Sequence, residues 1–331
     1  MKSINRRQFI AGSVAAASLP AATASAEPAP KIQRRSLGKT GMKVSILGLG
    51  GGSQFLNACK TDDQAAELVS AAIDGGINYL DSAYGYGNGE SLRRYGLVVG
   101  SRRKEVYLTS KTAQRGRDGA LKEVEIALKN LRTDHIDVMQ IHDIHPDEDL
   151  DKIVAKDGVY PALLELKRQK VVRAVGITGH ASVLKMSALL DRMEELDTIL
   201  FPVNPQRDSR HYLPTHEDAN PEGHFKEALL PKARTRGLAI IAMKSTAQGQ
   251  LIGAGPGKAN AETLIRFAMG ESGVCVVIVG PGSLENLKKN LAMAQSYAPL
   301  TVPERKQLIA QVSQPDRRFA FQDLAYRDGT G

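Results

Sequence analysis

Four side chains that can donate, accept or hold a proton lie near the ends of three successive apolar stretches. Asp81 closes the first stretch and Tyr86 follows it in a glycine-rich turn, Lys111 closes the second stretch, and His142 closes the third. A charged group at the end of an apolar strand is costly to bury without a partner, and this pattern is repeated from one stretch to the next. We therefore expect a carboxylate, a phenol, an ammonium and an imidazole to meet at one site and to carry out acid–base chemistry there.

Taken one at a time, these residues have simpler explanations. A tyrosine in a turn usually packs against its neighbours, a lysine at a strand end is usually solvated, and a histidine there usually fills an ordinary hydrogen-bonding role. The four residues make a site only if the fold brings the three strand ends to the same place.

The hydrophobic pattern predicts such a fold. Residues 31–44 read as a β-hairpin that turns at Leu37–Gly41, and after it apolar, β-rich stretches alternate with stretches of helical periodicity. The expected strands are 44–49, 77–83, 106–111, 136–142, 172–178, 198–203, 238–244 and 274–279. The expected helices are 63–73, 90–99, 120–131, 160–169, 182–193, 225–235, 261–269 and 284–294, with one more at 304–312.

Eight consecutive strand–helix units predict an α/β fold of the (β/α)8 TIM barrel type, with the hairpin at its N-terminus. A doubly wound sheet would contain similar units, but eight regular repeats in roughly 250 residues match the barrel. The long connections 144–159 and 206–223 follow strands, and we expect them to shape the site at the carboxyl ends of the strands.

The glycine run from Gly48 to Ser53 is similar to a dinucleotide-binding fingerprint, but the match fails in two places. Ser53 stands where a third glycine or alanine is required, and the next strand carries its acidic residue too far along the chain. The run therefore predicts a tight turn from strand to loop at least as well as a cofactor contact. Gly51 is kept as a candidate cofactor-binding residue.

The first 26 residues have the pattern of a cleavable export signal. A basic start is followed by a weakly apolar, alanine-rich stretch and by Ala24-Ser25-Ala26, which resembles a cleavage site. Arg6 and Arg7 before Gln8-Phe9-Ile10 resemble a twin-arginine signal, the alternative being a general secretory signal. We expect residues 1–26 to be a twin-arginine signal peptide, the export machinery to be a partner, the mature domain to be 27–331, and the location to be periplasmic.

Composition excludes several other classes of protein. The net charge of +8 hints at nucleic acid, but Lys2, Arg6 and Arg7 belong to the export signal, and the chain has no tryptophan for stacking on bases. We expect no nucleic-acid partner. Two cysteines exclude a disulfide scaffold. No apolar run reaches the roughly 18 residues that span a bilayer, so we expect no stable membrane insertion after cleavage.

The ordered motifs are similar to those of the aldo-keto reductase family. The resemblance is carried by the turn 81–87, Ser110-Lys111, the strand 137–142, the strand 172–178 and the segment 280–290. It extends over nearly the whole of residues 27–331. It implies an NADP(H)-dependent oxidoreductase that reduces a small-molecule aldehyde or ketone, with NAD(H) as the alternative cofactor.

The resemblance also implies roles for the four residues. Tyr86 is the proton donor, Lys111 lowers the pKa of its phenol and pairs with Asp81, and His142 orients the carbonyl or joins the proton relay. Hydride transfer to a carbonyl carbon builds negative charge on the oxygen, so the site needs a donor that releases its proton as that charge develops. A free phenol, with a pKa of about 10, is a weak match near neutral pH, and a nearby ammonium favours the phenolate.

Similarity to the family assigns a second set of residues to the cofactor. The nicotinamide end is expected at Thr178, and the phosphate and adenosine ends at Lys244, Ser245, Gly280, Gly282, Ser283, Asn286 and Asn290. The lysine, serine and arginine that many relatives use for a 2′-phosphate are replaced by Gly280, Pro281 and Asn286. The preference for NADP(H) therefore comes from the family rather than from these residues. Met243 occupies the position of an aromatic residue that often stacks on nicotinamide, and a thioether can cover a ring.

Two other functions stay open at this point. Reduced nicotinamide is not expected to be abundant outside the cytoplasm, so a nicotinamide-binding sensor or partner-protein subunit with little turnover is one alternative. A barrel lyase or isomerase with a lysine base is the other, and it would act without nicotinamide. No metal site is expected, because His142 and His145 flank a strand end and do not share a helix face.

Smaller features receive ordinary interpretations. The arginine-rich stretches 93–94, 102–103 and 115–117 are expected to be solvated faces and loop edges. Cys275 lies in an apolar strand and is expected to be an inert core thiol. Cys59 lies in a predicted loop, where a thiol can react, but no neighbouring residue in the sequence favours reactivity.

Overall fold

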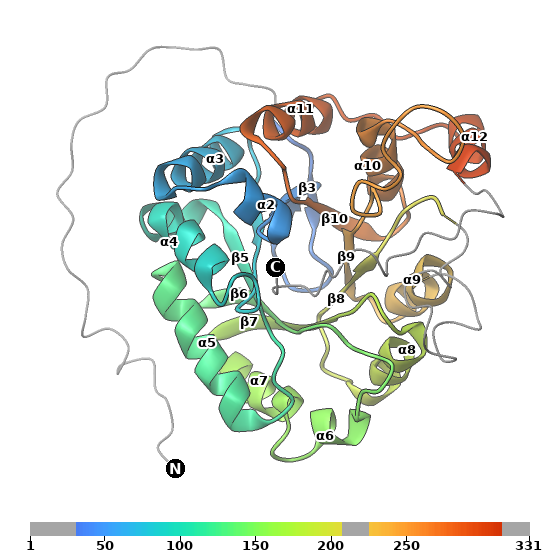
Figure 1. The fold of residues 1–331 in the computed structure, drawn as a ribbon. Coiled ribbons are helices and arrows are strands. Elements are labelled where there is room, and N and C mark those ends of the chain that lie inside the picture. The colour runs from blue at the N-terminus through green and yellow to red at the C-terminus, as the bar shows by residue number, and fades with distance from the viewer. Residues whose placement is uncertain (1–30, 207–224, 313–331) are drawn as a thin grey trace.

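The computed structural model describes residues 31–206 and 225–312, and their core is a closed barrel of eight parallel strands in the order β10-β3-β4-β5-β6-β7-β8-β9 (Figure 1). The strands are β3 (Leu47–Gly50), β4 (Tyr79–Asp81), β5 (Tyr107–Thr112), β6 (Ile136–Ile141), β7 (Val172–Thr178), β8 (Thr198–Pro202), β9 (Ala239–Met243) and β10 (Val274–Val279). Almost all of their residues are buried, Arg173 in β7 being exposed, which is why the strands read as nearly continuous apolar runs. The predicted (β/α)8 fold is confirmed.

The helices surround the barrel. They are α2 (Ser53–Ala58), α3 (Asp62–Asp74), α4 (Glu90–Arg102), α5 (Arg117–Leu131), α6 (Leu150–Val154), α7 (Val159–Arg168), α8 (Val183–Arg192), α9 (Phe225–Thr235), α10 (Ala261–Met269), α11 (Leu284–Gln295) and α12 (Val302–Val312), with a 3-10 turn η2 (Arg103–Glu105). Each predicted helix is present. The short elements α2, α6 and η2 were not predicted, because 3 to 6 residues are too few to show a helical period.

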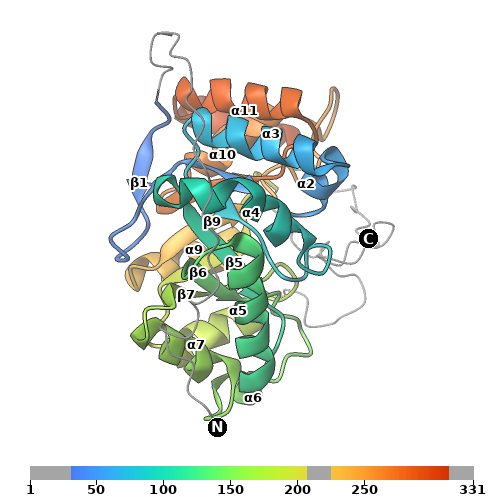
Figure 2. The same cartoon turned by 90° about the vertical axis from the view of Figure 1, so that its left-hand side faces the viewer.

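The N-terminal hairpin closes the amino end of the barrel. Strand β1 (Arg34–Ser36) pairs antiparallel with β2 (Lys43–Ser45), and Figure 2 shows β1 at one end of the molecule, beside the barrel. Val44 is fully buried in a cluster with Val138 and Ile241 inside the barrel. The predicted single strand 44–49 is wrong in this respect. It divides at Ile46 into one strand of the hairpin and one of the barrel.

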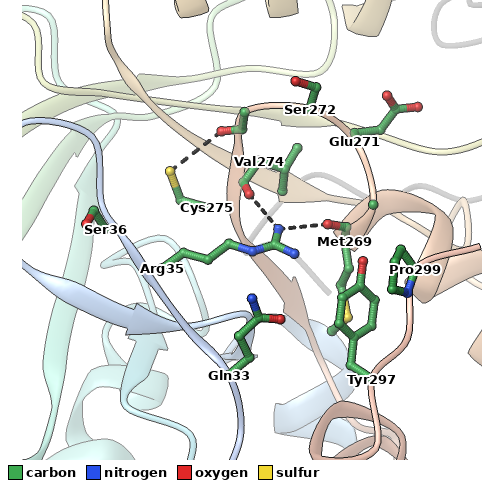
Figure 3. Close-up of a pocket in the computed structure, with 12 residues that line it drawn as sticks. Gln33, Arg35, Ser36, Met269, Glu271, Ser272, Val274, Cys275, Tyr297 and Pro299 are labelled. Carbon is green, nitrogen blue, oxygen red and sulfur yellow. Dashed lines mark hydrogen bonds between the residues drawn. The ribbon is translucent and has the colours of Figure 1, made fainter.

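Arg35 fastens this hairpin to the barrel. Its Nη1 donates hydrogen bonds to the carbonyls of Met269, at 2.7 Å, and Val274, at 2.8 Å, and its guanidinium lies 5.8 Å from the centroid of the Tyr297 ring (Figure 3). These groups border a surface cavity of about 530 Å3 at the floor of the barrel. Cys275 is buried beside it, as expected of a core thiol.

Several arginines are less exposed than the sequence suggested. The side chains of Arg94, Arg103 and Arg115 are only 12, 17 and 14% exposed. Arg103 pairs at 2.6 Å with Asp137, which is buried in β6 and also pairs with Arg173. The prediction of solvated arginines is therefore wrong for these three positions, because each has an acidic partner supplied by another part of the fold or by its own helix.

The predicted export signal at 1–26, most of the connection 206–223 and the tail after Val312 lie outside the described residues. Within 31–206 and 225–312, no helix is long and apolar enough to cross a membrane.

Candidate active site

The barrel brings the ends of β4, β5 and β6 together. Asp81 is the last residue of β4, Lys111 is the penultimate residue of β5, and His142 follows the end of β6. The strands pair in parallel, with Asp81 beside Thr109 and Lys111 beside Gln140. The residues predicted to converge therefore come from three adjacent strands at the carboxyl end of the barrel, where barrel enzymes build their sites.

Lys111 is the centre of this group. Its Nζ lies 2.6 Å from Oδ1 of Asp81, 3.0 Å from Oη of Tyr86 and 3.0 Å from the carbonyl oxygen of Ser82. An ammonium has three N–H donors, and these three acceptors account for all of them. Lys111 and Asp81 are each 1% exposed, so the pair is buried and depends on these partners.

Tyr86 lies in the turn that leads into α4 and is 8% exposed. Its phenol oxygen accepts the hydrogen bond from Lys111, and Nζ also lies 4.5 Å from the centroid of its ring. The ring of His142 packs edge-on against it, with centroids 5.6 Å apart and an interplanar angle of 79°. All four predicted residues therefore belong to one constellation.

Two other tyrosines near this group have a different character. Burial raises the pKa of Tyr79 well above its usual range, and the charge of Asp81 adds to this. Burial acts in the same way on Tyr95, whose hydroxyl donates to the carbonyl of Leu49 at 3.2 Å. Both rings are fully buried, whereas Tyr86 lines a cavity. Of these three tyrosines, Tyr86 is therefore the one whose side chain borders space for a bound molecule.

The cavity beside Tyr86 has a volume of about 830 Å3. Small-molecule and cofactor sites measure roughly 300 to 1,000 Å3, so its size is typical. It runs from Asp81 and Tyr86 to the strand end of β10 and the start of α11. Its walls include most of the residues predicted to bind a cofactor, namely Lys244, Ser245, Gly280, Gly282, Asn286 and Asn290. Met243 also lines it.

Three predicted cofactor residues lie elsewhere. Gly51 packs behind the cavity wall, where its N–H donates to the carbonyl of Asp81 at 2.7 Å and a Cβ would stand 2.4 Å from Oγ of Ser91. Ser283 caps α11 by accepting a hydrogen bond from the N–H of Asn286. Thr178 is 2% exposed at the end of β7.

Other cavity residues escaped the sequence interpretation. Gln54 lies on α2, a helix too short to be predicted, and Gln248 lies in the loop after β9. Cys59 does lie in a loop, between α2 and α3, but its side chain is only 1% exposed. Burial raises the pKa of its thiol, against a smaller opposing effect of Arg94, and both the burial and the raised pKa disfavour a reactive thiolate. In the described part of the chain, no group of three or more histidine, cysteine or acidic residues is arranged to hold a metal ion.

Known proteins resemble this chain over most of its length. It is 27% identical to L-galactose dehydrogenase of Arabidopsis thaliana over 300 residues, which cover 79% of this chain and 88% of the plant protein. It is 25% identical to the uncharacterized oxidoreductase YqkF of Bacillus subtilis (strain 168) over 315 residues, covering 86% of this chain and 97% of that protein.

Solved structures share the fold. An aldo-keto reductase of Bacillus halodurans, AKR11C1 in its holo form, superposes with a TM-score of 0.68 at 22% identity, covering 87% of this chain and 99% of the other. An aldo-keto reductase of Klebsiella pneumoniae in complex with NADPH gives a TM-score of 0.66 at 20% identity, covering 88% and 98% of the two chains. Residues 47–263 match the model of the Aldo/keto reductase family. The protein is therefore a member of the aldo/keto reductase family of oxidoreductases.

Proposed function

We propose that this protein reduces an aldehyde or ketone to an alcohol with NADP(H), and that Tyr86 donates the proton. The observation that carries the proposal is the Lys111 ammonium, shared between Asp81 at 2.6 Å and the Tyr86 phenol at 3.0 Å, beside a cavity of cofactor size. The family membership and the structural relative that holds NADPH support the choice of reaction and cofactor.

The cavity walls fit a dinucleotide. Gly280 and Gly282 have no side chain that would cover their backbone. A Cβ on Gly282 would meet no atom closer than 3.4 Å, so the space beside this backbone is open and a ligand can approach it. The first turn of α11 follows directly, and helix N-termini favour phosphate groups. Lys244 and Lys289 add positive charge along the same cavity. These residues would hold the phosphates, and Met243, which lines the same cavity as Tyr86, would cover the nicotinamide ring.

When bound, reduced nicotinamide supplies a hydride to the carbonyl carbon. The chain must then neutralise the charge that develops on the carbonyl oxygen. Tyr86 gives its proton to that oxygen, and the Lys111 ammonium stabilises the phenolate that remains. Asp81 accepts a hydrogen bond from Lys111 at 2.6 Å and so holds its Nζ in place. The His142 ring packs against Tyr86, and its role in this proposal is to orient the carbonyl that receives the proton.

The alternative, a nicotinamide-binding protein with little turnover, is separated from an enzyme by one substitution. Tyr86→Phe removes the phenol oxygen and leaves the rest of the cavity wall in place. We expect carbonyl reduction to fall at least about a hundredfold, the usual contribution of a positioned general acid, while NADPH binding changes little. Binding is measured by calorimetry, and turnover by nicotinamide absorbance with a panel of carbonyls that includes aldoses, given the plant relative. A Phe variant that keeps its turnover would refute the role of Tyr86.

We further propose that residues 1–26 direct export through the twin-arginine pathway, so that the enzyme works in the periplasm. The Arg6-Arg7 pair and the weakly apolar stretch after it support this location. Replacement of both arginines by lysine should hold the protein in the cytoplasm, as seen by cell fractionation. Export that persists in this variant, or a precursor that is never shortened, argues against the pathway.

A further inference from the structure

Arg115 lies in the loop between β5 and α5, and its side chain turns toward the loop that follows β6. Its guanidinium forms two parallel hydrogen bonds to Glu148, with Nε 2.6 Å from Oε1 and Nη2 2.7 Å from Oε2. Both side chains are largely buried, at 14 and 10% exposure. A planar guanidinium matches a carboxylate in this two-point geometry, so the pair holds Arg115 in one orientation.

The same guanidinium binds the backbone on which His142 is mounted. Besides its bond to Glu148, Nη2 has one further N–H, which is shared between the carbonyl oxygens of His142, at 3.0 Å, and Asp143, at 3.1 Å. Nη1 donates to the carbonyl of Ala113 at 3.0 Å. The N–H of His142 donates in turn to the carbonyl of Thr112 at 2.8 Å. Residue 142 is therefore held through both its N–H and its carbonyl by the end of β5 and the loop after it.

Asp143 shows why this turn needs support. Its φ is +55°, in the left-handed region that residues other than glycine seldom adopt. Such conformations cost about 1–3 kcal/mol and persist only when neighbouring groups fix them. Two successive carbonyls converge on one guanidinium nitrogen here, and the Asp143 carboxylate lies between His145, at 3.0 Å, and His180, at 3.2 Å.

We propose that Arg115, held by Glu148, is a positioning residue of the reaction, which fixes the turn at residues 142–143 and thereby the His142 ring against Tyr86. This inference rests on the proposed function. We call the Arg115–Glu148 pair and its bonds to the carbonyls of His142 and Asp143 the clamp. The His142 ring is in edge contact with Tyr86. Loss of the clamp would let this ring move away from the place where it is proposed to meet the substrate oxygen. A displacement of about 1 Å in such a site can cost on the order of a hundredfold in rate.

Arg117 provides a matched control two residues away. It pairs with Glu165 of α7 at 2.6 Å, and the two side chains are 28 and 35% exposed. Its N–H donates to the carbonyl of Asp157 in the loop before α7, so these contacts lie away from His142. Removal of either arginine deletes one ion pair from the same region. Only the removal of Arg115 also releases the carbonyls of His142 and Asp143.

The kinetic test compares Arg115→Ala, Arg115→Lys and Glu148→Gln with Arg117→Ala. We expect kcat for carbonyl reduction to fall about 10- to 100-fold in Arg115→Ala and less in Glu148→Gln, with the NADPH dissociation constant unchanged. Lysine keeps the charge but lacks the planar, two-point donor geometry of a guanidinium, so Arg115→Lys should remain impaired. Added guanidinium should restore part of the activity of Arg115→Ala. A kcat within twofold of the wild type in Arg115→Ala, or equal losses in both alanine variants, overturns the proposal.

A second readout does not depend on turnover. The ring signals of His142 are followed by NMR in protein labelled with 15N-histidine, and assigned with His142→Gln. We expect these signals to shift in Arg115→Ala and Glu148→Gln and to stay in place in Arg117→Ala. Unmoved signals in Arg115→Ala show that the clamp does not position the ring. If the wild type reduces none of the carbonyls, the proposed function fails, and the NMR result still decides the role of Arg115.

Discussion

Lys111 offers a strict test of the site, because its ammonium is the group on which Asp81 and Tyr86 both depend. Lys111→Met removes the charge and leaves a side chain of similar length. Asp81, at 1% exposure, then keeps a buried carboxylate without its cation, and the carbonyl of Ser82 loses a donor. Breaking one partner out of a buried ion pair costs about 3–5 kcal/mol, so we expect that loss in the free energy of unfolding.

The double variant separates stability from chemistry. Asp81→Asn combined with Lys111→Met removes both charges, so its loss of stability should be smaller than the sum of the two single losses. Activity should be absent from all three variants. Unfolding is followed in urea by circular dichroism and turnover by nicotinamide absorbance.

The control for this test is Lys289→Met. Lys289 pairs with Glu285 at 2.6 Å on the surface of α11, where both side chains are at least 70% exposed. Its stability should equal that of the wild type, because exposed ion pairs contribute little. A Lys111→Met variant as stable as Lys289→Met, or strictly additive losses in the double variant, would refute the buried pair as the organiser of the site.

Two further predictions concern the surroundings of the site. The hydrogen bond to the Asp143 carboxylate raises the pKa of His145. Protonated His145 therefore stabilises the fold fully below its unfolded pKa of about 6.5, and this contribution is lost as the pH rises through the folded pKa. The stability difference between the wild type and His145→Gln should therefore narrow from pH 5.5 to pH 8.5, and a constant difference contradicts the pairing. Gly51→Ala places a Cβ 2.4 Å from Oγ of Ser91 and should cost about 1–3 kcal/mol, measured by urea unfolding, whereas Gly116→Ala, whose Cβ meets nothing within 4 Å, should be well tolerated.

The meeting of Asp81, Tyr86, Lys111 and His142 was predictable because it depends on strand ends. The apolar stretches that end in Asp81, Lys111 and His142 are visible in the sequence. In a closed parallel barrel, the carboxyl ends of neighbouring strands lie together at the same end of the barrel. Tyr86 is tied to this end by the short turn between β4 and α4. Topology therefore converts sequence order into spatial proximity without knowledge of any loop.

Contacts made by loop side chains could not be predicted in this way. The sequence alone predicts a solvated loop residue at Arg115. Its partner Glu148 lies 33 residues further along the chain, and nothing in the local sequence of Arg115 indicates this pairing. The sequence correctly predicts a loop at Cys59, but it does not show that the fold buries the thiol there. Such contacts depend on the path of each loop, which a hydrophobic pattern does not encode.

Gly51 shows a different limit. The sequence marked it as a glycine near a cofactor, and the residues on either side, Gly50 and Gly52, do line the cavity. Side chains on adjacent residues of an extended segment point to opposite faces, so Gly51 faces Ser91 and Tyr95. A register difference of one residue separates a cavity wall from a packing contact, and glycines, which have no side chain, leave no pattern by which to detect it.

Arg35 and Arg115 show how the barrel separates stability from chemistry. Both guanidinium groups donate to two carbonyls of a neighbouring segment, Arg35 at the floor and Arg115 at the mouth. At the floor, the hairpin covers an apolar interior. We therefore expect loss of Arg35 to lower the free energy of unfolding and to leave turnover unchanged. At the mouth, the carbonyls belong to the turn that carries His142, so the same chemical loss displaces a residue of the site. The two arginines make the same kind of hydrogen bond. The end of the barrel at which each lies determines whether its removal lowers the free energy of unfolding or the rate of turnover.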